Sequence, residues 1–156
     1  MSIQRVREFF RKKNIEEKIR EFDVSSATVE LAAQALGCGP ERIAKSLSFS
    51  VNGEPVLIVT AGDVKIDNPK YKAQFAAKAK MLSPQETEDL IGHAVGGVCP
   101  FALKPGVRVF LDVSLKRFET VFPACGSSNS AIELSVKELE ELSGYEAWVD
   151  VCKPKQ

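Results

Sequence analysis

The sequence predicts one α/β domain in which helices pack around a mixed, partly antiparallel sheet. A chain of 156 residues with 44% hydrophobic side chains can bury one core, so we expect a single domain over residues 1–156. A hairpin pattern over residues 43–61 supplies the centre of a sheet. Helical and strand-like segments intermix without a regular strand–helix–strand rhythm, which favours a mixed sheet over a parallel one.

The chain opens with an amphipathic segment. Ile3, Val6 and Phe10 recur at helical spacing between basic residues, and a helix is therefore predicted over residues 3–19. A short extended piece is expected over residues 20–24.

A second helix is predicted over about residues 28–36. Thr28 and the two serines near it offer N-cap oxygens. Gly37 can end the helix because glycine adopts the left-handed conformation at little cost.

Residues 43–51 alternate in the manner of a strand with two different faces. One face carries Ile43, Lys45, Leu47, Phe49 and Val51, and the other carries Ala44, Ser46, Ser48 and Ser50. Asn52-Gly53 is typical of a two-residue type I′ turn, and residues 56–61 return as a buried strand.

The middle of the chain contains two helix signals and a glycine-rich segment. Asn68-Pro69 resembles a cap followed by a first-turn proline, which predicts a helix over about 69–77. Ser83-Pro84-Gln85-Glu86 combines a capping box with such a proline, and Gly92 can close that helix. Residues 93–101 are expected to be irregular.

The last third is predicted to return to the sheet. Strands are expected over residues 107–111, 119–122, 131–134 and 148–151, with a turn over 126–129. Ser135-Val136-Lys137-Glu138 is a second capping box, and it opens a helix that Gly144 can end.

Composition restricts the partners of this protein. Basic and acidic residues number 21 each, so a long track of uncompensated phosphate contacts, as on DNA, is not expected. No apolar run approaches the roughly 18 residues that span a bilayer, which predicts no membrane partner and a cytoplasmic location. The four cysteines form no C-x-x-C pair, so neither zinc nor a disulfide framework is expected.

Lys45 is unusual because it stands on the otherwise apolar face of its strand. A buried ammonium is costly without a partner, so Lys45 either reaches water at the rim of the sheet or binds an anion. The residues alone leave these alternatives evenly balanced.

The segment His93-Ala94-Val95-Gly96-Gly97-Val98-Cys99-Pro100-Phe101 is the second candidate. Its glycines allow backbone amides to approach a ligand closely, and its proline fixes the turn that presents them. Such a loop can donate N–H groups to an oxyanion or to ribose oxygens. The alternative is an ordinary tight connection after a helix.

Together these motifs resemble the YbaK/EbsC family of trans-editing aminoacyl-tRNA deacylases, which includes the editing insertion domain of bacterial prolyl-tRNA synthetase. The similarity extends over essentially the whole chain. The motifs that carry it are Ile43-Ala-Lys-Ser-Leu, the Val51-Asn-Gly hairpin, Val95-Gly-Gly-Val-Cys-Pro-Phe and Ala131-Ile-Glu-Leu. The resemblance implies a curved, barrel-like sheet and hydrolysis of the ester at the 3′ acceptor end of a mischarged tRNA.

The resemblance also implies which residues form the site. The essential pocket lysine of the family corresponds to Lys45, which we interpret as an electrostatic anchor for the catalytic site. The substrate-binding candidates are Gly96, Gly97, Val98, Cys99 and Pro100 of the loop, His93 before it, and Gly126 and Ser127 of the late turn. The implied substrate is a small amino acid such as alanine or cysteine on tRNA-Pro. Prolyl-tRNA synthetase is a candidate partner, and no metal or organic cofactor is implied.

Three alternatives remain open. Cys99 could be a nucleophile with His93 as its base, although a small loop-lining side chain is favoured. The fold could bind tRNA or a synthetase without catalysis. The same pocket could also serve a free aminoacyl or nucleotide ligand.

Overall fold

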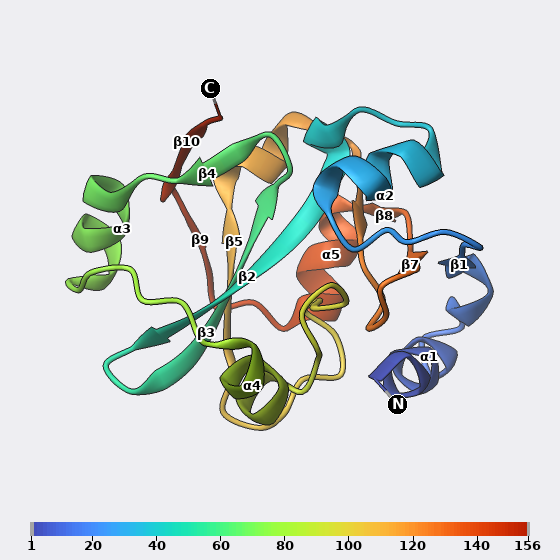
Figure 1. Ribbon diagram of the computed structural model, residues 1–156, viewed down its shortest axis with the longest axis horizontal. Coiled ribbons are helices and arrows are strands. Elements are labelled where there is room, and N and C mark those ends of the chain that lie inside the picture. The colour runs from blue at the N-terminus through green and yellow to red at the C-terminus, as the bar shows by residue number, and fades with distance from the viewer. Residues whose placement is uncertain (1, 156) are drawn as a thin grey trace.

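The computed structural model describes residues 2–155 as one α/β domain built on a curled, half-barrel sheet (Figure 1). The order of its six strands is β8-β6-β2-β3-β5-β9. Their bounds are β2 Ile43–Val51, β3 Glu54–Ala61, β5 Arg108–Asp112, β6 Thr120–Pro123, β8 Leu134–Ser135 and β9 Ala147–Val149. The pairs β2–β3 and β6–β8 are antiparallel, whereas β2–β6, β3–β5 and β5–β9 are parallel. The predicted mixed, partly antiparallel and curved sheet is confirmed.

Two small antiparallel sheets flank this core. Strand β1 (Arg20–Glu21) pairs with β7 (Ser130–Ala131), which ties the segment after the first helix to a late loop. Strand β4 (Val64–Ile66) pairs with β10 (Cys152–Pro154), and this pair brings the end of the chain beside the turn that follows β3.

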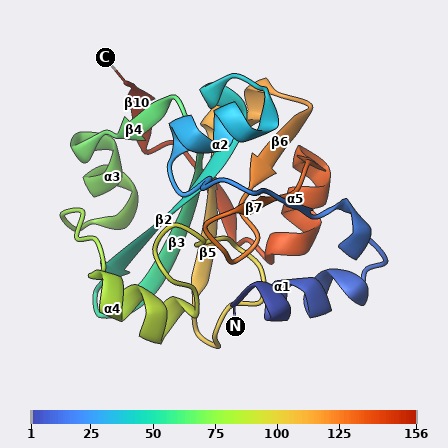
Figure 2. The ribbon, with the colours of Figure 1, turned by 45° about the vertical axis from the view of Figure 1, so that its right-hand side comes forward.

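Helices cover both faces of the main sheet. Their bounds are α1 Ser2–Arg11, α2 Val29–Leu36, α3 Asn68–Phe75, α4 Pro84–Glu86 and α5 Val136–Ser143. In both views α3 and α5 lie on opposite sides of the sheet (Figure 1, Figure 2). The Tyr71 ring of α3 lies 5.2 Å from the Phe49 ring of β2. On the other face, Trp148 Nε1 donates to Glu140 Oε2 of α5 at 2.8 Å.

The β2–β3 hairpin forms as predicted and sets the two faces of the site. Asn52 (φ 52°) and Gly53 (φ 83°) both adopt the left-handed conformation that a type I′ turn requires. In the resulting register Lys45 lies opposite Thr60, and Ser46 lies opposite Val59. Because successive side chains alternate, Lys45 and Ser46 leave the strand on different faces.

The helix caps that the sequence predicts are present. Thr28 caps α2, and Gly37 ends it with φ 70°. Ser83 and Ser135 each form a complete capping box. Beyond α4 the helix continues as a π-helical turn, Thr87–Ile91, which Gly92 closes. Within residues 2–155, no helix has the length and hydrophobicity to cross a membrane.

The prediction of one helix over residues 3–19 is wrong. Helix α1 ends at Arg11, Asn14 turns the chain with φ 62°, and a separate 3₁₀ turn covers Glu16–Lys18. The amide of Ile15 donates to the Phe10 carbonyl at 3.1 Å, so the turn folds Ile15 back onto the core. Asparagine tolerates the left-handed conformation well enough to allow this.

Three other boundaries also differ from prediction. The expected strand over 131–134 is divided into β7 and β8, because the Ile132 amide donates a hydrogen bond to the Pro123 carbonyl at 3.1 Å. The closing strand ends at Val149, and Val151 N instead donates to Asp112 Oδ1 at 2.9 Å. The cap of α3 is Asp67 rather than Asn68, since the Asp67 carboxylate accepts the Lys70 amide.

Candidate functional site

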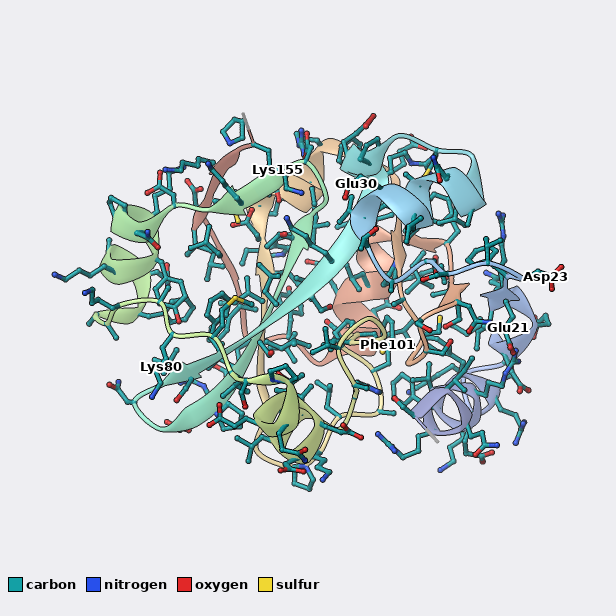
Figure 3. All side chains as sticks on the ribbon, in the orientation of Figure 1. Glu21, Asp23, Glu30, Lys80, Phe101 and Lys155 are labelled. Carbon is teal, nitrogen blue, oxygen red and sulfur yellow. The ribbon has the colours of Figure 1, made fainter. Side chains whose placement is uncertain are left out.

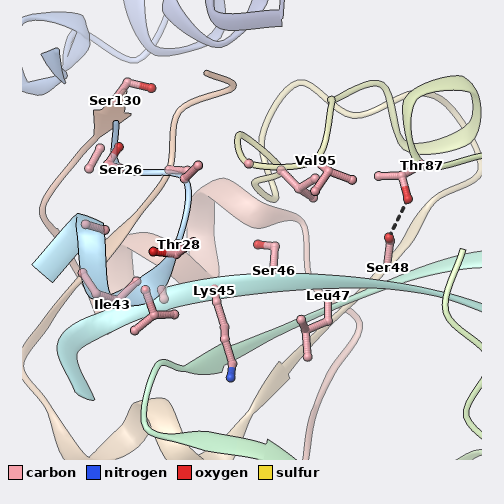
Figure 4. A pocket seen from close by; sticks show the side chains of 18 of the residues that line it. Ser26, Thr28, Ile43, Lys45, Ser46, Leu47, Ser48, Thr87, Val95 and Ser130 are labelled. Atoms are coloured by element: carbon pink, nitrogen blue, oxygen red, sulfur yellow. Dashed lines mark hydrogen bonds between the residues drawn. The ribbon is translucent and has the colours of Figure 1, made fainter. Parts of the chain in front are cut away.

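A cavity of about 320 Å³ opens between β2, the segment before α2 and the glycine-rich loop (Figure 4). Its lining comes from residues within 26–32, 43–48, 81–87, 95–98 and 122–131. Most of these side chains are aliphatic or aromatic, and the polar ones are mainly hydroxyls. The size and lining suit a small ligand held by a few directed hydrogen bonds.

Lys45 borders this cavity, but its ammonium points away from the loop. In Figure 4 the Lys45 side chain leaves β2 on the opposite side from Ser46 and Val95. Its Nζ donates to the backbone carbonyl of Val64. No salt bridge to Lys45 is found among the residues that the structure describes. The lysine is therefore half-buried without a neutralising carboxylate.

The surroundings of this ammonium favour an anion. Burial and, to a smaller extent, repulsion from Lys155 together lower the pKa of Lys45 to about 8. The tail that carries Lys155 is fixed because the Lys155 amide donates to the Asp63 carbonyl at 3.0 Å. Lys155 and Glu30 lie at the same end of the molecule (Figure 3). The Asp63 carboxylate is itself paired with Arg117 at 2.6 Å.

The glycine-rich loop forms the opposite wall of the cavity. Gly96 and Val98 line it, and Val95, with 64% of its surface exposed, stands at the rim. Met81 is 58% exposed and also borders the opening. This part of the site therefore offers an apolar edge to a bound group.

Gly97 lies against the late turn rather than in the cavity. A Cβ atom at Gly97 would come within 2.6 Å of Ser127 N and 2.7 Å of the Gly126 carbonyl carbon. The Gly97 amide donates to the Ala94 carbonyl at 3.0 Å, so it is occupied. Gly126 and Ser127 thus support the loop from behind, and neither is part of the cavity wall.

His93 and Cys99 are completely buried beneath the loop. His93 Nε2 donates to the Phe101 carbonyl at 2.7 Å, and Nδ1 accepts from the Ser2 hydroxyl of α1. Burial lowers the pKa of His93 and raises the pKa of the Cys99 thiol to about 12. The thiol is therefore protonated near neutrality, although its Sγ lies 3.5 Å from Nε2. This geometry gives both residues a role in supporting the loop and argues against the cysteine-nucleophile alternative, as does the burial of neighbouring Pro100.

Several cavity residues were not found from the sequence. In the sequence, Ser26 and Thr28 match only the pattern of helix caps, and Thr87 and Ser130 belong to no binding motif. The wall they form depends on a long-range contact, in which the Ser26 amide donates to the Ser128 carbonyl at 2.6 Å. Within residues 2–155, no group of three or more histidine, cysteine or acidic side chains could hold a metal ion.

Comparison with known proteins identifies the family. The model of the aminoacyl-tRNA editing domain matches residues 23–142, and the chain belongs to this family. It is 58% identical to the uncharacterized protein YwhH of Bacillus subtilis, with 98% of each chain covered. It is 30% identical to a proline–tRNA ligase of Geobacillus sp. over 65% of this chain, which corresponds to only 18% of the ligase.

The fold comparison agrees with this assignment. The structure superposes on the crystal structure of a candidate trans-editing enzyme for prolyl-tRNA synthetase with a TM-score of 0.87. The two sequences are 27% identical, and 97% of each chain is covered. The resemblance to the YbaK/EbsC family and to the synthetase editing domain is confirmed.

Proposed function

We propose that this protein is a trans-acting deacylase that hydrolyses the ester of a mischarged tRNA. Its substrate would carry a small amino acid, such as alanine or cysteine, on tRNA-Pro. The observation that carries the proposal is the mainly apolar cavity between Lys45 of β2 and the Gly96 loop, in a chain of the aminoacyl-tRNA editing family. The similarity to proline–tRNA ligases supports tRNA-Pro as the carrier.

Lys45 acts in this proposal as an anchor for the phosphate of the terminal nucleotide. Among residues 2–155, the hydrogen-bond partner of its ammonium is a backbone carbonyl, and Lys155 beside it increases the attraction for an anion. The flexible four-carbon stem of lysine allows Nζ to exchange the Val64 carbonyl for a phosphate at the edge of the cavity. This contact between Lys45 and the phosphate positions the ester in the cavity, and it does not require Lys45 to act as a base.

The loop positions the reacting group. Since the Gly97 amide is occupied, the amides of Gly96 and Val98 are the candidates for holding the ester carbonyl as negative charge develops on it. Val95 and Met81 provide an apolar edge for the terminal base. An aminoacyl ester is already activated, so water held in this geometry, or a group of the substrate itself, can attack it without a catalytic triad.

One observation favours a second candidate function, a non-catalytic module that binds tRNA or a synthetase. No histidine or carboxylate lines the cavity among the residues described. General-base help would then have to come from the substrate or from bound water.

Deacylation assays with three alanyl substrates separate these functions. The substrates are alanyl-tRNA-Pro, an alanyl minihelix of its acceptor stem and an alanyl-adenosine ester. We expect wild-type protein to hydrolyse the first two far faster than the third, and Lys45→Ala to lose most of this activity while remaining folded. Preferential cleavage of the adenosine ester would indicate a small-molecule hydrolase. Binding of charged tRNA without cleavage would support the non-catalytic module.

A further inference from the structure

One hydroxyl in the cavity has no hydrogen-bond partner among residues 2–155. The cavity is lined by six serine and threonine side chains. Five of them are paired: Ser26 with the Ser128 carbonyl (3.4 Å), Thr28 with the Leu31 amide (3.2 Å), Ser48 with Thr87 (2.9 Å), and Ser130 with Ser127 (2.7 Å). The sixth, Ser46 Oγ, is buried and makes no hydrogen bond within the part of the chain that the structure describes.

Ser46 places this hydroxyl on the side of β2 that faces the cavity. In Figure 4 the Ser46 side chain points from β2 to the side of the cavity where Thr28 and Val95 lie. The lining also contains Ala44, Val98 and Ala131, none of which has a polar side-chain atom to offer. A serine hydroxyl can donate one hydrogen bond and accept others, and its staggered rotamers can turn it into the cavity.

A buried hydroxyl without a hydrogen bond is energetically unfavourable, so this group can discriminate between ligands. A ligand that supplies the missing hydrogen bond is preferred over an otherwise identical ligand that cannot, because the second leaves the protein group unsatisfied. Apolar contacts discriminate much less between side chains of similar size.

We propose that Ser46 selects the amino acid in this cavity, and that it favours an ester whose small side chain carries a hydroxyl group, seryl over alanyl. The inference rests on the proposed deacylase function and narrows its substrate. The Ser46 hydroxyl pairs with the hydroxyl of the substrate, while the apolar lining encloses the remainder of the small side chain.

The test compares initial rates for seryl-tRNA-Pro and alanyl-tRNA-Pro with wild type, Ser46→Ala and Ser48→Ala. Ser48 is the matched control, because it lies on the same face of β2 and its hydroxyl is already paired with Thr87. We expect wild type to prefer the seryl ester and Ser46→Ala to reduce the seryl-to-alanyl ratio of kcat/KM by roughly five- to tenfold. Ser48→Ala should leave this ratio unchanged.

Thermal unfolding gives a readout that does not depend on catalysis. Ser46→Ala should keep or raise the melting temperature, since it removes an unsatisfied hydroxyl. Ser48→Ala should lower it, because buried Thr87 would lose its partner. An unchanged seryl-to-alanyl ratio in Ser46→Ala, or a fall in its melting temperature as large as that of Ser48→Ala, would overturn this inference. Neither result would bear on the proposed deacylase function. Failure of wild type to cleave either ester would overturn this inference, and failure to cleave cysteinyl-tRNA-Pro as well would overturn the proposed function.

Discussion

Lys45 and Ser46 are neighbours in β2, yet their side chains lie on opposite faces of the strand. Lys45 reaches the Val64 carbonyl beside the β4–β10 pair, whereas Ser46 faces the cavity below the Gly96 loop. One strand thus provides a cation at the edge of the site and an unpaired hydroxyl inside it. In the proposed deacylase these groups would contact different parts of the substrate, the phosphate and the amino acid.

Replacement of Lys45 by methionine should stabilise the fold and reduce activity. Desolvation of the half-buried ammonium costs about 1–2 kcal/mol after allowance for solvent screening, and the methionine side chain avoids this cost. Urea unfolding at pH 7 measures the gain, with Lys65→Met at an exposed position of β4 as the control. A Lys45→Met protein that is less stable than wild type would contradict this account.

The stability difference should depend on pH in a defined direction. The pKa of Lys45 is about 8 when folded and 10.5 when unfolded, so the unfolded state binds more protons between these values. The penalty in wild type is therefore complete below pH 8 and is relieved as pH rises towards 10.5. Unfolding curves at pH 7, 9 and 10 should show the advantage of Lys45→Met shrinking. If the stability difference between Lys45→Met and wild type were the same at all three pH values, titration of Lys45 would not be its cause.

Deacylation should fall as pH rises through about 8. The kcat/KM value follows the ionisation of the free enzyme, and the proposed phosphate anchor needs protonated Lys45. Rates must be corrected for spontaneous hydrolysis of the ester at each pH. A kcat/KM value that stays flat from pH 7 to 9.5 would exclude an anchoring role for the ammonium.

Gly97→Ala should displace the loop. The new Cβ would meet the backbone of Gly126 and Ser127, which cannot move aside as a flexible side chain can. We expect a loss of roughly 1–3 kcal/mol in stability and a reduced kcat/KM. Gly39→Ala is the control, because the three atoms nearest to its Cβ would all belong to the mobile end of the Glu41 side chain. Equal stability and equal kcat/KM in the two variants would show that the close backbone contact at Gly97 is not required for either property.

His93 should make the fold sensitive to acid without acting in catalysis. Burial lowers its folded pKa below the usual 6.5, so stability is lost as pH falls below about 6.5 towards that value. His93→Gln can still donate to the Phe101 carbonyl, and it should reduce this acid sensitivity while retaining deacylation. Loss of deacylation in folded His93→Gln protein would instead indicate a catalytic histidine.

Local sequence signals predicted the parts of the fold that local interactions determine. The Asn52-Gly53 turn and the capping boxes at Ser83 and Ser135 involve residues three or fewer positions apart. The missed β4–β10 pair joins segments nearly ninety positions apart, between Val64–Ile66 and Cys152–Pro154, and no local pattern marks it.

The same distinction applies to the site. Alternation along β2 predicted that Lys45 and Ser46 leave the strand on different faces. It could not show that Val64 and Lys155 would surround the ammonium, because those contacts arise from the fold of the whole chain. Nor could it show that, within the described part of the chain, every cavity hydroxyl except that of Ser46 would be paired.

The most direct test of the proposed function is the initial rate of ester hydrolysis on tRNA-Pro charged with alanine, cysteine, serine or proline. The same wild-type preparation should be used throughout, with Lys45→Ala as the folded control. We predict rapid hydrolysis of at least one mischarged tRNA, sparing of prolyl-tRNA-Pro, and loss of the activity in Lys45→Ala. Hydrolysis of none of the mischarged species, or the same rate with Lys45→Ala as with wild type, would contradict the account.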